Sequence, residues 1–324
     1  MDKLIEKIVQ KRNPTVAGLD PRLEYLPEEL INKHFKDVID MRAAARAILE
    51  FNKVILDNIH DIVPAVKLQI AYYEMYGLAG LETFIKTAEY AKSKGLIVIG
   101  DVKRNDIGST AGAYSNAFIG RTPLRDQYTR AFPVDIITVN PYFGTDGIKP
   151  FLDDCRRYNR AIFVLVKTSN PSSCEFQDLI TVDGSRIYEE VGKRVNEWGS
   201  DLVGEHGYSR VGAVVGATFP HQLVELRETM RGVHFLVPGY GAQGGSVNDV
   251  LGGFDNRGLG AIINASRSIM CAYLSETWRD KFGPQDFGAA SRAEVIKMRE
   301  EILGGLRAKG FDDYRFHQGG DTCL

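Results

Sequence analysis

Short apolar runs rich in β-branched residues recur along the chain, and each is followed by a longer stretch in which apolar positions repeat with helical spacing. Runs of this length and composition predict β-strands. Eight of them occur, at residues 15–19, 62–68, 96–102, 136–139, 161–166, 211–215, 234–237 and 261–263. Their hydrophobicity is continuous rather than alternating, which indicates that helices cover both faces of a parallel sheet.

The segments between these runs are amphipathic, and the clearest predicted helices cover residues 43–59, 81–93, 187–205 and 222–230. Eight strand-then-helix units favour an α/β fold of the (β/α)8 TIM-barrel type, which typically needs roughly 250 residues. A doubly wound open sheet is the competing architecture, because the number of strands does not distinguish the two.

No linker, internal repeat or low-complexity tract divides the 324 residues. We therefore expect a single barrel domain over residues 1–324, with its core at about 15–280 and a C-terminal helix and tail at about 283–324. A polar insertion at residues 170–183 follows the fifth predicted strand. It is either a loop over an active site or a solvated surface loop, because barrel enzymes carry their chemistry on the loops after the strands.

Charge and composition narrow the class of protein. The 40 Lys and Arg residues against 42 Asp and Glu residues give a net charge of −2, which argues against a nucleic-acid polymer as partner. The four cysteines show no C-x-x-C spacing, which is typical of reduced thiols. Because no signal peptide and no run of about 18 apolar residues occurs, we expect a cytoplasmic protein without a membrane partner.

The most informative polar residues follow the third run, in Asp101-Val102-Lys103-Arg104-Asn105-Asp106. With a strand period of two, Asp101 and Lys103 lie on one side, and Asp106 lies in the turn that enters the next helix. A lysine between carboxylates stays protonated, so it is a good proton donor and a poor nucleophile. The pattern indicates a reaction in which negative charge leaves the site and a carbon is protonated; a surface salt-bridge cluster is the alternative.

Lys67 ends the second run and would extend this group to an alternating Lys-Asp-Lys-Asp array, unless it reaches past the barrel rim into water. The G-x-G-x-x-G of residues 239–244 lacks the acidic residue at a strand end about 20 residues later that a dinucleotide fingerprint requires. We interpret it as a loop whose backbone N–H groups approach a phosphate. Arg267, just after the eighth run, is its predicted charge partner, with a surface salt bridge as the alternative.

Other chemistries lack their motifs in this sequence. The six histidines show no metal-binding spacing such as H-E-x-x-H, and neither a G-x-S-x-G elbow nor a G-x-x-x-x-G-K-[ST] loop is present. We therefore assign no metal site and no catalytic histidine.

Six motifs between about residue 15 and residue 273 form one combination. They are Gly18-Leu19-Asp20-Pro21, Val66-Lys67, the D-x-K-x-x-D of residues 101–106 with Ile107 and Thr110, Thr168-Ser169-Asn170-Pro171, residues 238–245, and Ser266-Arg267-Ser268-Ile269. This combination resembles the orotidine 5′-phosphate decarboxylases of the longer bacterial subgroup. The resemblance implies a barrel enzyme that converts orotidine monophosphate to uridine monophosphate (UMP) and CO2 in de novo pyrimidine biosynthesis, without a metal or another cofactor.

The resemblance also implies roles for the charged residues. Lys103 corresponds to the proton donor to C6 of the pyrimidine, and Asp101 to the carboxylate beside that of the substrate. Asp106 and Thr110 correspond to positions that reach the neighbouring site across a homodimer interface. Lys67 completes the charge array.

The remaining correspondences concern the nucleotide substrate. Asp20 and Lys67 resemble contacts to the ribose hydroxyls, Ser169 resembles a contact to the pyrimidine ring, and Gln243 and Arg267 resemble the phosphate site. Pro238 and Ser266 belong to the same substrate-binding set. Ser266 is a departure, because many members have glycine before the arginine.

Three other functions compete with this interpretation. Metal-dependent sugar-phosphate decarboxylases or aldolases on the same barrel share the D-x-K-x-x-D but carry a glutamate where this chain has Lys67. A Schiff-base aldolase would use Lys67, Lys103 or Lys167 as a deprotonated amine, which neighbouring carboxylates oppose. A catalytically silent phosphate-binding barrel is the third.

Overall fold

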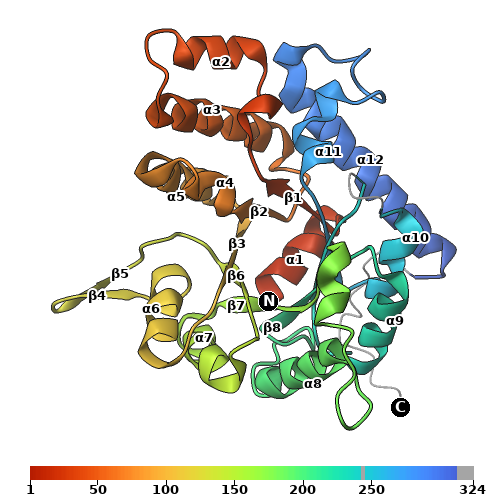
Figure 1. Cartoon of the computed structure of the whole chain (residues 1–324). Coiled ribbons are helices and arrows are strands. Elements are labelled where there is room, and N and C mark those ends of the chain that lie inside the picture. The colour runs from red at the N-terminus through yellow and green to blue at the C-terminus, as the bar shows by residue number, and fades with distance from the viewer. Residues whose placement is uncertain (242–244, 312–324) are drawn as a thin grey trace, which may run out of the picture.

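The computed structural model describes residues 1–241 and 245–311. Eight parallel strands form a closed barrel in the order β1-β10-β9-β8-β7-β6-β3-β2, and β2 pairs with β1 to close the ring (Figure 1). The closed ring confirms the predicted barrel and excludes the open sheet. The strands are β1 (Thr15–Leu19), β2 (Ala65–Gln69), β3 (Ile97–Arg104), β6 (Ile136–Val139), β7 (Ala161–Lys167), β8 (Val211–Val215), β9 (Phe235–Pro238) and β10 (Ala261–Ala265).

Helices surround the barrel, as its continuous apolar strands require (Figure 1). They are α1 (Asp2–Lys11), α2 (Glu28–Phe35), α3 (Met41–Ile59), α4 (Ala71–Glu74), α5 (Gly77–Ser93), α6 (Gly108–Phe118), α7 (Gly144–Tyr158), α8 (Ile187–Gly199), α9 (Pro220–Thr229), α10 (Val247–Val250), α11 (Arg267–Met270) and α12 (Phe287–Ala308). The predicted helices correspond to α3, α5, α8 and α9.

The predicted end of the helix at residue 205 is wrong, because α8 stops at Gly199. The Gly199 carbonyl accepts a hydrogen bond from the Ser209 hydroxyl at 2.9 Å, and Val203 forms an antiparallel bridge with Ser209. A Cβ atom on residue 199 would lie 2.3 Å from the Ser209 Oγ. The chain therefore turns back where the apolar pattern alone predicts continuation.

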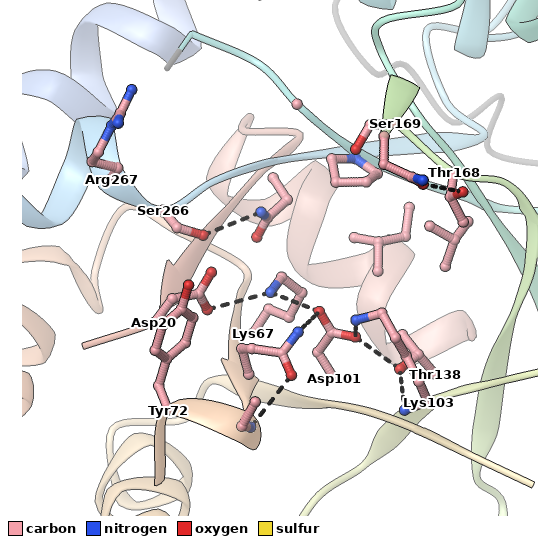
Figure 2. A pocket seen from close by; sticks show the side chains of 18 of the residues that line it. Asp20, Lys67, Tyr72, Asp101, Lys103, Thr138, Thr168, Ser169, Ser266 and Arg267 are labelled. Carbon is pink, nitrogen blue, oxygen red and sulfur yellow. Dashed lines mark hydrogen bonds and ion pairs between the residues drawn. The ribbon is translucent and has the colours of Figure 1, made fainter. Parts of the chain in front are cut away.

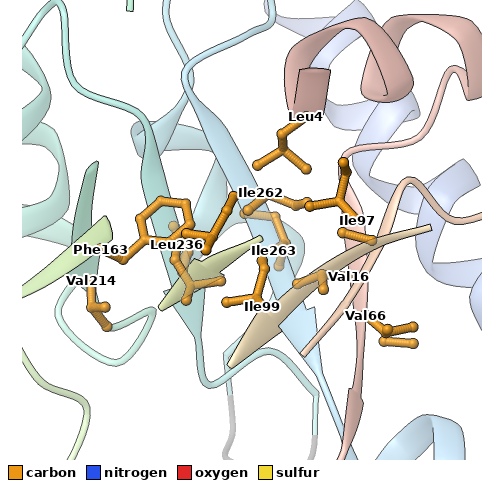
Figure 3. Packing of buried hydrophobic residues seen from close by; sticks show 14 of the residues in the cluster. Leu4, Val16, Val66, Ile97, Ile99, Phe163, Val214, Leu236, Ile262 and Ile263 are labelled. Carbon is orange, nitrogen blue, oxygen red and sulfur yellow. The ribbon is translucent and has the colours of Figure 1, made fainter. Parts of the chain in front are cut away.

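The barrel interior is apolar towards the N-terminal ends of the strands. Side chains from several strands, among them Val16, Ile99 and Ile263, converge with Leu4 of α1 in one buried cluster (Figure 3). Helix α1 lies at the N-terminal ends of the strands, because its residues line a small cavity together with the first residues of β3, β6 and β7. The opposite end of the barrel is left open for polar residues.

Two elements extend the basic barrel. The C-terminal helix α12 packs on α3, where the rings of Phe51 and Phe287 stack with centroids 4.9 Å apart. An antiparallel hairpin of β4 (Thr122–Leu124) and β5 (Gln127–Thr129) projects from the barrel between α6 and β6 (Figure 1). The sequence pattern does not predict this hairpin, because its strands are short and largely exposed.

Phe84→Ala in α5 tests the contribution of the helical layer. Phe84 is fully buried and contacts the rings of Tyr73 and Phe132 edge-on, at centroid distances of 5.3 and 5.9 Å. Removing the ring should lower the free energy of unfolding by about 3–5 kcal/mol, through lost burial and a residual cavity. Leu78→Ala in the same helix is the control, because Leu78 is 86% exposed. Equal urea midpoints for the two variants would contradict this packing.

Candidate active site

A cavity of about 830 Å³ opens at the C-terminal ends of the barrel strands. Most of the predicted site residues line it, although they come from distant parts of the sequence. They are Asp20, Lys67, Asp101, Lys103, Ser169, Pro238, Ser266 and Arg267. In Figure 2, Lys103 and Asp101 lie on one side of the cavity, and Arg267 lies on the other.

Four charged side chains form a chain along one wall of this cavity. Lys67 Nζ lies 3.4 Å from Asp20 Oδ1 and 3.0 Å from Asp101 Oδ2. Lys103 Nζ lies 2.5 Å from the other carboxylate oxygen, Asp101 Oδ1. Along the wall the alternation of acid and base therefore runs Asp20, Lys67, Asp101, Lys103.

Asp101 is the centre of this chain, and two uncharged residues hold it in place. Gln69 Nε2 donates to Asp101 Oδ2 at 3.0 Å, and the Thr138 hydroxyl donates to Asp101 Oδ1 at 2.9 Å. Together with the two lysines, these groups give the carboxylate four donors (Figure 2). Sequence reasoning did not identify Gln69 and Thr138, whose only signal is their place at or near the ends of apolar runs.

An irregularity in β3 directs Lys103 towards Asp101. The register of β3 against β6 shifts between Gly100 and Arg104, and Lys103 has a left-handed φ of 48°. Such a conformation costs about 1–3 kcal/mol for a residue other than glycine, and bulges next to active sites commonly redirect a side chain. The Lys103 N–H compensates in part, because it donates to the Thr138 hydroxyl at 3.0 Å.

The neighbouring opposite charges in this row keep one another ionised, although burial favours the neutral forms. Burial disfavours the ammonium of Lys67, but the carboxylates of Asp20 and Asp101 outweigh it and raise the pKa of Lys67. Burial likewise opposes ionisation of Asp101, yet Lys67 and Lys103 bring the pKa of Asp101 well below its usual range. Both groups therefore stay charged at neutral pH. The Lys67 side chain is only 5% exposed, whereas that of Lys103 is 44% exposed towards the cavity.

Ser266 and Arg267 follow β10 on the other side of the cavity. Ser266 has a φ of −116°, so this position does not require glycine. Its hydroxyl occupies space that Gly18 leaves open, because a Cβ atom on residue 18 would lie 1.9 Å from the Ser266 Oγ. The departure from the family pattern at residue 266 is thus accommodated by Gly18 on the neighbouring strand β1.

The glycine-rich loop begins directly after β9. Gly239 and Gly241 have positive φ values of 105° and 71°, which a residue with a side chain adopts only with strain. Between them, the Tyr240 hydroxyl donates to Glu301 of α12 at 2.6 Å. The C-terminal helix therefore anchors this side of the cavity. Gln243 lies outside the described residues.

Asp106 and Thr110 do not line this cavity. Asp106 is partly exposed and its carboxylate accepts a hydrogen bond from the Ile107 N–H at 2.7 Å, while Thr110 is exposed on α6. The predicted Lys-Asp-Lys-Asp array thus has its first three members, Lys67, Asp101 and Lys103, together in this cavity, without Asp106.

Lys167 also does not line the cavity. Its side chain is fully buried and donates to Asp178 at 2.7 Å, and its ammonium lies 4.4 Å from the centre of the Phe219 ring. This ion pair fastens the inserted segment after β7, whose first residue, Asn170, lines the cavity. A Schiff-base role for Lys167 is incompatible with this position.

Among residues 1–241 and 245–311, no three His, Cys, Asp or Glu side chains come together in an arrangement that could hold a metal ion. No helix in those same residues is both long and apolar enough to span a lipid bilayer.

The sequence profile of the Orotidine 5'-phosphate decarboxylase / HUMPS family matches residues 37–277. The chain belongs to this family. Orotidine 5'-phosphate decarboxylase of Caldicellulosiruptor saccharolyticus is 45% identical over 306 residues, which cover 94% of this chain and 98% of that protein.

Solved structures of the family agree with the fold. Leishmania donovani OMP decarboxylase is 30% identical with a TM-score of 0.70, and the match covers 94% of this chain and 97% of that one. Leishmania donovani UMP synthase is 31% identical with a TM-score of 0.71, but the match covers only 55% of that chain.

The buried carboxylate makes a prediction about pH. Because the folded state lowers the pKa of Asp101, its contribution to stability is complete above the unfolded-state pKa of about 4 and is lost as the pH falls further. Asp101→Asn leaves Lys67 without its nearest counter-charge and should lower the free energy of unfolding by roughly 3 kcal/mol at pH 7. This difference from the wild type should shrink as the pH falls towards about 3.

Urea denaturation between neutral and acidic pH measures this effect. Asp126→Asn is the matched control, because Asp126 is exposed in the turn of the β4–β5 hairpin. A constant difference between wild type and Asp101→Asn over the whole pH range would contradict the assignment of a low pKa to Asp101.

Proposed function

We propose that this chain decarboxylates orotidine 5′-phosphate to UMP and CO2, the step that completes UMP in de novo pyrimidine biosynthesis, and that it works in the cytoplasm. Family membership and the names of its relatives support the reaction. The observation that carries the proposal is the contact of 2.5 Å between Lys103 Nζ and the buried Asp101 carboxylate. It provides a proton donor directly beside a fixed negative charge.

The polar groups of the cavity suit a nucleotide monophosphate. We assign the phosphate to Arg267, Ser266 and the glycine-rich loop with Gln243. The pyrimidine ring would then lie towards Lys103, with Ser169 and Pro238 beside it. The ribose hydroxyls would contact Asp20 and Lys67. A cavity of about 830 Å³ is within the usual range for small-molecule sites.

The chemistry follows from the charge chain. The bond between C6 and the substrate carboxylate breaks, CO2 leaves, and the electron pair stays on C6. The Lys103 ammonium stabilises this developing negative charge and then transfers a proton to C6, after which solvent reprotonates the lysine. Because Lys67 and Asp101 are fixed before the substrate binds, little reorganisation is needed in the transition state.

Asp101 and the phosphate site lower the activation barrier of decarboxylation by two different effects. The Asp101 carboxylate repels that of the substrate and loses this repulsion when CO2 departs. Contacts to the distant phosphate supply binding energy that holds the reacting group beside Asp101. The proposal needs no metal or other cofactor, because the Lys103 ammonium supplies the positive charge at C6.

We further propose that the active unit is a homodimer in which Asp106 and Thr110 complete the site of the partner subunit. Their exposure on the described chain, away from its own cavity, supports this placement. Asp106 of one subunit would then become the fourth member of the Lys-Asp-Lys-Asp array of the other. Isologous dimers exchange equivalent residues in this way.

Lys103→Ala tests the proposed proton donor. The variant should lose turnover by a factor of about 10³ or more, because it lacks both the proton and the charge that stabilises C6. UMP binding, which depends on the phosphate and ribose contacts, should stay measurable. The assay follows the loss of ultraviolet absorbance of orotidine monophosphate with EDTA-treated protein.

Lys149→Ala, which removes an exposed lysine on α7, is the control and should retain full activity. Near-normal turnover by Lys103→Ala would contradict the assignment of the proton donor. Loss of wild-type activity on EDTA treatment would instead favour the metal-dependent relatives.

Mixing two inactive variants tests the shared site. A mixed dimer of Lys103→Ala and Asp106→Ala subunits contains one intact site if Asp106 serves the partner, so random re-association should restore roughly a quarter of wild-type activity. The measurement is turnover after the two variants are denatured together and refolded.

A mixture of Lys103→Ala with Lys67→Ala is the matched control. Both lysines belong to the same subunit's cavity, so no mixed dimer regains an intact site and the mixture should stay inactive. Equal inactivity of the Asp106→Ala mixture would show that Asp106 does not act across the interface.

A further inference from the structure

A second cavity, of about 570 Å³, lies at the end of the barrel opposite the candidate active site. Its walls come from connections that lead into strands: Arg160 directly precedes β7, and Arg210 directly precedes β8. Six arginines line it, namely Arg121, Arg130, Arg156, Arg157, Arg160 and Arg210, together with Ile119, Gly120, Tyr158 and Asn159. No acidic side chain is among these lining residues.

Carboxylates outside the cavity neutralise only part of this charge. Arg156 pairs with Asp153 at 3.0 Å and with Asp201 at 2.7 Å. Arg160 pairs with Asp135 at 2.7 Å, but Asp135 is shared with Lys92. The other four arginines form no ion pair with a carboxylate of the described residues.

Several of these guanidinium groups are shielded from water without full compensation. Burial lowers the pKa of Arg130, and the like charges of Arg160 and Arg121 lower it further against the effect of Asp135. The buried Nε atoms of Arg160 and Arg210 have no hydrogen-bond partner in the described part of the chain. Buried donors normally have a partner, so the positive charge around the cavity is incompletely compensated.

Two arginines at the rim of the cavity pack against one aromatic ring. The guanidinium carbons of Arg121 and Arg157 lie 5.5 and 5.4 Å from the centre of the Tyr158 ring. Asn159 follows in a left-handed conformation that ends α7, and Arg160 comes next, directly before β7. Stacking on a ring leaves the N–H edges of a guanidinium available to a ligand.

We propose that this cavity binds a small polyanion with two or more phosphate groups, such as a diphosphate or the oligophosphate part of a nucleotide. A guanidinium group binds two phosphate oxygens at once. A cluster of arginines therefore suits a ligand with several phosphate groups better than a ligand with a single carboxylate. The volume is within the range for small ligands. A nucleic-acid polymer is disfavoured, because the arginines line one compact cavity rather than an extended surface and the whole chain has a net charge of −2.

Calorimetric titration of the full chain with inorganic pyrophosphate tests the site. The double variant Arg121→Gln/Arg157→Gln removes two exposed rim charges, so the barrel should fold normally. We expect its affinity for pyrophosphate to fall at least about tenfold, since charge-assisted contacts are lost. Arg267→Gln alters only the opposite cavity and should leave this binding event in place.

Arg194→Gln removes an exposed arginine of α8 that pairs with Glu197 and serves as the matched control. Arg121→Lys/Arg157→Lys should recover part of the affinity, which a loss of folding would not allow. The proposal is overturned if pyrophosphate binding is absent, or survives in Arg121→Gln/Arg157→Gln and disappears in Arg267→Gln. Tighter binding of a short oligouridylate than of pyrophosphate at the same arginines would overturn it in favour of a polymer.

Discussion

The buried Asp101 carboxylate is the constraint on which the candidate active site depends. A carboxylate in this position is tolerated only because Lys67, Gln69, Lys103 and Thr138 all donate to it. These donors come from three adjacent strands, β2, β3 and β6. The pairing of these neighbouring strands is therefore a condition for the charge array as well as for stability, since separating them would leave a buried charge unpaired.

Two residues of this site adopt arrangements that lower the stability of the folded state. Lys103 lies in a left-handed conformation beside a bulge, and the Lys67 ammonium is almost fully buried. Both cost free energy. The core of the barrel offsets them, because strands such as β1, β6 and β10 are buried at every position. A strand buried on both faces leaves little freedom to relax, so the costly positions at the strand ends persist.

The sequence pattern predicted the eight strands and most of the cavity because both depend on local order: apolar runs mark the strands, and ionisable residues at their ends mark the open face. Features that depend on pairing between distant residues were missed. Thr138 resembles an ordinary β-branched strand residue, and the bulge at Lys103 arises from the register against β6. The bond between Tyr240 and Glu301 joins the glycine-rich loop to a helix about 60 residues later.

The two ends of the barrel treat positive charge differently, and the net charge of −2 conceals this. Around Asp101, carboxylates and lysines alternate, so that wall is electrically satisfied before any ligand arrives and can act on a substrate without reorganising. At the opposite end, arginines from several connections converge without acidic residues between them. Fixed carboxylates offset only part of this positive charge, so a bound anion would stabilise this end of the barrel, whereas the charges around Asp101 already compensate one another.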